Sequence, residues 1–124
     1  MKDQITPHGL NLLKAIAHEL LIYNEMLRMG KHNQRSAIVD TLNARYPKEN
    51  IKLYPLCQEL GYVCRKCPIN WSNDPSVKIN CNDPKSVYHE YLRTPDHDKE
   101  KQDALLHSVI DLMIAELMKM TGQA

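Results

Sequence analysis

Hydrophobic residues recur at helical spacing in two long stretches, one near each end of the chain. In the first stretch, apolar positions three or four residues apart form one seam: Leu13, Ile16, Leu20, Tyr23 and Leu27, widened by Leu10, Ala17 and Leu21. Thr6 is typical of an N-cap, Pro7 of a first helical position and Gly30 of a helix stop. We therefore predict a helix from Pro7 to Met29.

The C-terminal stretch has a second stripe at the same spacing. It contains Leu106, Val109, Met113, Ile114, Leu117 and Met120, broadened by Leu105, Ile110 and Leu112. The stripe predicts a helix from Asp96 to Met120, where Thr121 and Gly122 supply the stop. At about 1.5 Å per residue the two helices are roughly 35 and 38 Å long. Mutual burial in a hairpin or small bundle explains both stripes.

Shorter elements fill the space between the two long helices. A helix from Ser36 to Arg45, ended by Pro47, is expected to fold back on the first. Residues 68–84 are rich in Pro, Asn, Asp and Ser and are predicted to be an irregular loop. Because a loop of this length is uncommon in a compact domain, we expect something to brace it.

The fold class that follows is mostly α, a helical hairpin or small bundle in a single domain of 124 residues. We divide it into N-terminal helices (7–46), a four-cysteine metal-binding segment (54–84) and C-terminal helices (85–121). Four isolated glycines exclude a glycine-rich phosphate loop. A net charge of +1 gives no general attraction to nucleic acid or to an anionic membrane.

Metal binding by the four cysteines is the predicted means of bracing this loop. Cys57, Cys64, Cys67 and Cys81 have the spacing Cys-x6-Cys-x2-Cys-x13-Cys. The pair Cys64 and Cys67 is typical of a metal knuckle, and the two outer cysteines complete a tetrahedron. Cys57 is expected on a short helical turn between Pro55 and Gly61, and another helix is expected to start at Asp83 and Pro84.

Zinc is the predicted metal, because four thiolates satisfy it in a closed, structural site. An iron–sulfur cluster is the alternative, since it also takes four cysteines and one of its signatures ends in Cys-Pro, as Cys67-Pro68 does. A site in which His89 replaces Cys57 is a further alternative. Metal ligation by clustered cysteines also fits a reducing cytosol better than disulfides do.

The beginning of the chain is polar and lacks the apolar core of a signal peptide, and its apolar runs are too short to span a bilayer. We therefore expect a cytoplasmic protein without a membrane partner.

The cysteine region resembles a family of small bacteriophage and prophage proteins. The residues that carry the resemblance are Cys57, the run from Cys64 to Ile69, and Cys81-Asn82-Asp83-Pro84 leading into Tyr88. The family shares a Cys…Cys-x2-Cys-Pro-Ile/Val…Cys core, and the match covers about the last 70 residues. Many relatives have a further cysteine where this chain has Tyr54 or Pro55. The resemblance implies a phage origin, hence the host cytoplasm, and a metal site; it implies no reaction.

No catalytic residues are predicted. The carboxylates Asp96 and Glu100 lack the lysine that a nuclease pattern needs, and His18-Glu19 is followed by Ile22 where a metalloprotease has its second histidine. The order of the cysteines and Pro68 is the reverse of that in zinc deaminases. We therefore expect a non-enzymatic protein.

Candidate partner or nucleic-acid contacts surround the cysteines: Arg65, Lys66, Trp71 and Lys78. The function predicted is that of a zinc-stabilised accessory protein that binds a macromolecule, such as an inhibitor of a host defence or regulatory protein. The alternatives are a small nucleic-acid-binding zinc protein and an iron–sulfur redox or sensing module. Sequence leaves open whether the first helix packs internally or in a homodimer.

Overall fold

Five helices make up the regular structure of the described residues, and none of these residues forms a strand. The computed structural model describes residues 7–30, 34–62, 67–72, 76–81 and 83–122. The helices are α1 (Pro7–Met29), α2 (Arg35–Arg45), α3 (Pro55–Glu59), α4 (Val87–Arg93) and α5 (Lys99–Met120). The predicted mostly α class is confirmed.

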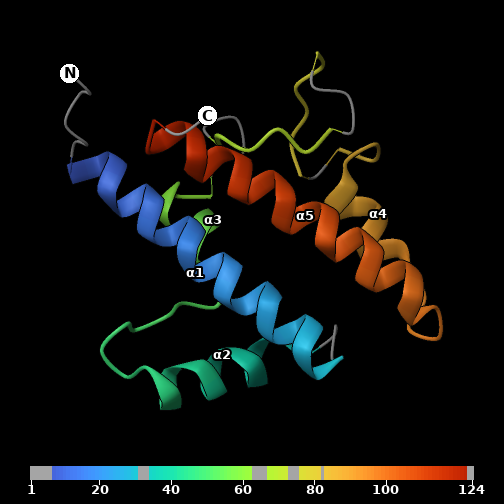
Figure 1. Ribbon diagram of the computed structural model, residues 1–124, viewed down its shortest axis with the longest axis horizontal. Coiled ribbons are helices and arrows are strands. Elements are labelled where there is room, and N and C mark those ends of the chain that lie inside the picture. The colour runs from blue at the N-terminus through green and yellow to red at the C-terminus, as the bar shows by residue number, and fades with distance from the viewer. Residues whose placement is uncertain (1–6, 31–33, 63–66, 73–75, 82, 123–124) are drawn as a thin grey trace.

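The two long helices α1 and α5 pack side by side and run in opposite directions (Figure 1). Helices α2 and α3 pack on α1, and α4 packs on α5. Among the described cysteines, Cys57 lies on α3, and Cys67 and Cys81 lie in the irregular chain that leads to α4.

Helix α1 has the predicted bounds, but its buried face differs from the predicted seam. Ile16 and Tyr23 are buried as expected, whereas Leu10 is 57% exposed. Ile22 and Met26, which lie outside the predicted seam, are buried. Helix α1 contacts α2, α3 and α5, so its apolar side chains are buried on more than one face of the helix. Thr6, the predicted N-cap, lies outside the described residues.

Helix α5 starts three residues later than predicted. Pro95 follows Thr94, the C-cap of α4, and the chain turns through a hydrogen bond from the Asp98 N–H to the Pro95 carbonyl before α5 begins. Asp98 then caps α5 by accepting the Lys101 N–H at 3.3 Å. In the predicted stripe Leu106, Val109 and Met113 are buried, but Ile114 is 42% exposed because it faces away from α1.

The short helices follow their end signals. Helix α2 begins one residue before the predicted Ser36, and α3 begins at Pro55 with proline in the first turn. Helix α4 begins at Val87 rather than at Asp83 and Pro84, because the buried Ser86 is its N-cap and accepts the His89 N–H at 2.9 Å.

A buried carboxylate joins three of the helices. Glu19 of α1 is 3% exposed; its Oε2 lies 2.9 Å from Arg35 Nη2 of α2, and its Oε1 accepts the Leu56 N–H of α3 at 3.3 Å. The Arg35 guanidinium also donates to the Leu53 carbonyl. Two charged groups on separate helices are thus buried together, with hydrogen bonds to satisfy them.

A second carboxylate on α1 fixes the far end of α2. Glu25 is buried and bonds to Arg28 and to Arg45, the last residue of α2. The hydrogen bond from Arg28 lowers the pKa of Glu25 to about 2, so the carboxyl stays ionised at neutral pH.

No helix in the described part of the chain is both long enough and apolar enough to cross a membrane.

The buried pair predicts a large stability loss on truncation of Glu19. We expect Glu19→Ala to lower the free energy of unfolding by about 3–5 kcal/mol, because it leaves the Arg35 charge buried without its partner. Urea unfolding measures the loss. The control is Asp40→Ala, which removes an exposed carboxylate from α2; a Glu19→Ala loss within about 1 kcal/mol of that control contradicts the role given to the pair.

Candidate metal centre

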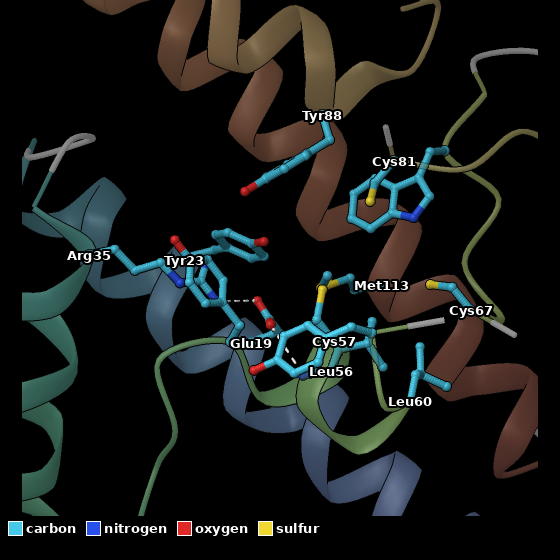
Figure 2. A pocket seen from close by; sticks show the side chains of 13 residues that line it. Glu19, Tyr23, Arg35, Leu56, Cys57, Leu60, Cys67, Cys81, Tyr88 and Met113 are labelled. Atoms are coloured by element: carbon cyan, nitrogen blue, oxygen red, sulfur yellow. Dashed lines mark hydrogen bonds and ion pairs between the residues drawn. The ribbon is translucent and has the colours of Figure 1, made fainter. Parts of the chain in front are cut away.

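Three of the four cysteines line one cavity of about 280 Å³. Its walls also come from α1, α2, α3, the start of α4 and α5 (Figure 2). The lining residues are Glu19, Tyr23, Arg35, Tyr54, Leu56, Cys57, Leu60, Tyr62, Cys67, Trp71, Cys81, Tyr88 and Met113. Three of the predicted ligands, Cys57, Cys67 and Cys81, thus lie around one cavity, on α3 and in the irregular chain before α4.

Cys57 is positioned by α3 and by the turn that follows it. The preceding residue, Leu56, is held to α1 through its N–H bond to Glu19. After α3 the chain reverses through two residues with positive φ, Gly61 (64°) and Tyr62 (63°). This left-handed geometry brings the Tyr62 N–H onto the Cys57 carbonyl at 2.7 Å.

The segment that carries Cys67 is fixed by backbone and side-chain hydrogen bonds instead of by a helix. Trp71 donates its N–H to the Ile79 carbonyl at 3.1 Å, and its own carbonyl accepts the Val87 N–H at 2.9 Å. Asn70 Oδ1 accepts the Ser72 and Ile79 N–H groups, each at 3.2 Å. These bonds tie the segment to the start of α4.

Cys81 is held by the cap of α4. The Ser86 hydroxyl donates to the Cys81 carbonyl at 2.7 Å and accepts the His89 N–H at 2.9 Å. One buried hydroxyl therefore fixes both the start of α4 and the backbone that presents the Cys81 thiol.

The other end of the cavity is aromatic and contains the buried ion pair. In Figure 2, Arg35, Tyr23 and Glu19 lie on one side of the cavity and Cys67 and Cys81 on the other. Arg35 lies 4.5 Å from the centroid of the Tyr54 ring. Burial alone lowers the pKa of Arg35, but the charge of Glu19 and the phenol of Tyr23 raise it above its ordinary value.

The buried phenols of Tyr23 and Tyr88 are neutral at physiological pH. Burial raises the pKa of Tyr88 to about 12. Burial and the negative charge of Glu19 raise the pKa of Tyr23 well above its ordinary value. The cavity therefore offers thiols on more than one wall, aromatic side chains and a compensated ion pair.

Several predicted site residues lie elsewhere. Cys64, Arg65 and Lys66 lie outside the described residues. His89, the alternative ligand, does not line the cavity. In the ranges that the structure describes, no three Cys, His, Asp or Glu side chains are close enough together to hold a single metal ion.

The predicted contact residues separate into a buried and an exposed group. Trp71 is 3% exposed and belongs to the core, so its ring is covered where a partner or a base would need to touch it. Lys78 is exposed as predicted. The exposed aromatic residues of the cavity rim are Tyr54 and Tyr62. The sequence offers Tyr62 as an aromatic residue near the cysteines that could stack on a base, whereas the signal for Tyr54 was only its place just before the short cysteine-bearing helix.

No model of a known protein family, no curated protein and no solved structure matches this chain.

The double role of Ser86 predicts a local effect at the cysteines. We expect Ser86→Ala to lower the free energy of unfolding by about 1–2 kcal/mol, through loss of the helix cap and of the bond to Cys81. We also expect faster reaction of the Cys81 thiol with a thiol-specific reagent. Ser108→Ala is the control, since it removes a hydroxyl from mid-α5 that bonds only within its own helix. Equal thiol reactivity in both variants contradicts the positioning role.

Proposed function

We propose that this is a non-enzymatic, phage-type accessory protein whose central segment is held by a metal centre on its cysteines, and that it binds a macromolecular partner. The observation that carries the proposal is the convergence of Cys57, Cys67 and Cys81 on one cavity from three segments of the chain. Cys64, three residues before Cys67, is the fourth proposed ligand on the grounds of spacing.

The donor set fits a metal centre. Thiolates are the protein ligands that zinc and iron–sulfur clusters prefer, and the described residues between α3 and α4 form no helix or strand. A metal on three or four of these thiols would link α3, the Trp71 segment and the chain before α4, and so supply a brace between elements that are far apart in sequence.

A protein is the partner that we favour. Tyr54 and Tyr62 are exposed at the rim of the cavity, with Tyr62 at 66%, and Tyr is enriched where proteins contact one another. The metal centre would keep these two side chains in fixed positions on either side of α3. The phage origin and the host target rest on the resemblance of the cysteine segment alone.

Metal removal tests the proposed centre. We expect the purified protein to contain bound metal, and Cys57→Ser, Cys67→Ser and Cys81→Ser each to lose it together with the ordered structure of residues 57–84. Elemental analysis and near-ultraviolet circular dichroism measure the two losses. Cys64→Ser is expected to behave in the same way.

The control is Ala15→Ser, which places a hydroxyl at another buried position of the core, away from the cavity. This variant is expected to keep its metal. Cysteine variants that melt like the parent protein and contain as much metal contradict the proposal.

Tyr62 tests the proposed partner surface. After affinity purification from bacterial lysate and identification of the bound protein, we expect Tyr62→Asn to weaken binding to the purified partner at least about ten-fold, or 1.4 kcal/mol. Asparagine tolerates the left-handed backbone at this position. Tyr46→Asn is the matched control, because Tyr46 is exposed but lies off the rim.

Two outcomes contradict this part of the proposal. Equal partner binding by both tyrosine variants places the interface elsewhere. Salt-dependent binding to oligonucleotides that Lys78→Ala weakens supports the nucleic-acid alternative instead.

A further inference from the structure

Three thiols line a cavity that is large enough for a ligand of several atoms. In a tetrahedral zinc site the Zn–S bonds are about 2.3 Å, so the sulfurs lie about 3.8 Å apart and enclose no free volume. Here Cys57, Cys67 and Cys81 line a cavity of about 280 Å³. A ligand that itself contains several atoms would fill such a space and still reach thiols on different walls.

One residue of the cavity lining also has a buried polar hydrogen without an acceptor. Trp71 lines the cavity and is 3% exposed, and its Nε1–H is buried without a hydrogen-bond partner among the described residues. The backbone bonds to Ile79 and Val87 fix the residue on both sides. A buried N–H normally finds an acceptor, so the ligand of this cavity is expected to present one.

The remaining walls are apolar or neutral. Leu60, Met113 and the neutral phenol of Tyr88 line the space, and the ring of Tyr88 lies 5.5 Å from that of Trp71. Arg35 is compensated by Glu19, so no uncompensated charge in the described lining calls for a charged organic ligand. Metal-bound sulfur accepts N–H hydrogen bonds and tolerates apolar surroundings.

We propose that the cavity holds an iron–sulfur cluster with Cys57, Cys67 and Cys81 among its ligands, and that the Trp71 indole N–H donates a hydrogen bond to one of its sulfur atoms. This inference rests on the proposed function, because it requires these thiols to bind metal. It specifies that the metal is an iron–sulfur cluster and not a single ion. The three thiolates bind the iron atoms. Trp71 is a positioning residue, because it acts on the cluster through a hydrogen bond to one of its sulfur atoms.

Spectroscopy of the native protein tests the occupant. After expression with added iron and anaerobic purification, we expect a brown protein that contains iron and acid-labile sulfide in equal amounts. Trp71 is the only tryptophan, so its fluorescence reports on the cavity alone. We expect the cluster to quench this emission by energy transfer, and the emission to return when an iron chelator and oxidant remove the cluster.

The outcomes separate this inference from the proposed function. A colourless protein with bound zinc and unquenched Trp71 overturns the cluster and leaves the metal centre intact. A protein that binds neither metal, and whose cysteine variants fold as the parent does, overturns both.

A change at Trp71 tests the hydrogen bond. We expect Trp71→Phe to keep the cluster but to have a more negative reduction potential, because a donor to sulfur stabilises the cluster after it accepts an electron from dithionite. Tyr91→Phe, a buried aromatic outside the cavity, is expected to have the parent potential. Equal potentials in both variants overturn the role of Trp71.

If Trp71→Phe does not fold, nuclear magnetic resonance of the native protein provides the same test. We expect the indole N–H signal of nitrogen-labelled protein to be strongly shifted by the paramagnetic cluster when it is reduced. An indole signal that is unchanged by cluster loading and reduction overturns the hydrogen bond.

Discussion

The buried carboxylate of Glu19 is the contact on which the arrangement of the helices depends. It sits on α1 and holds Arg35 of α2 through an ion pair and Leu56 of α3 through a backbone hydrogen bond. Because both charges are removed from water, the pair tolerates little displacement of either helix. The same residues form one end of the cavity, so the clamp that joins the helices also shapes the site.

The two ends of the cavity are positioned by different means. At the Glu19 end, helices set the places of the side chains, and Cys57 follows directly after the anchored Leu56. At the other end the chain is irregular, and side chains satisfy its backbone: Asn70 accepts two N–H groups and Ser86 holds the Cys81 carbonyl. A binding site assembled in this way combines a rigid wall with a wall that a bound metal could stabilise further.

The helices could be predicted because periodicity and end signals act locally. Pro7, Gly30 and Pro55 marked boundaries that the structure has. Burial was harder to predict, since it depends on how many neighbours a helix has; Leu10 is exposed and Glu19 is buried for that reason. The burial of the aromatic residues was equally hard to predict. Trp71 belongs to the core, where backbone bonds to Ile79 and Val87 hold it, and Tyr62 to the surface, on a turn with positive φ.

The cavity has a consequence for how the protein is made. Its walls include Glu19 near the start of the described chain and Met113 in α5, so the enclosure cannot close until the ribosome has released nearly all of these elements. Contacts between residues so far apart in sequence form late, because loop closure must come first. During synthesis the thiols of Cys57, Cys67 and Cys81 are therefore exposed to metals, chaperones and oxidants before Met113 of α5 completes the cavity wall.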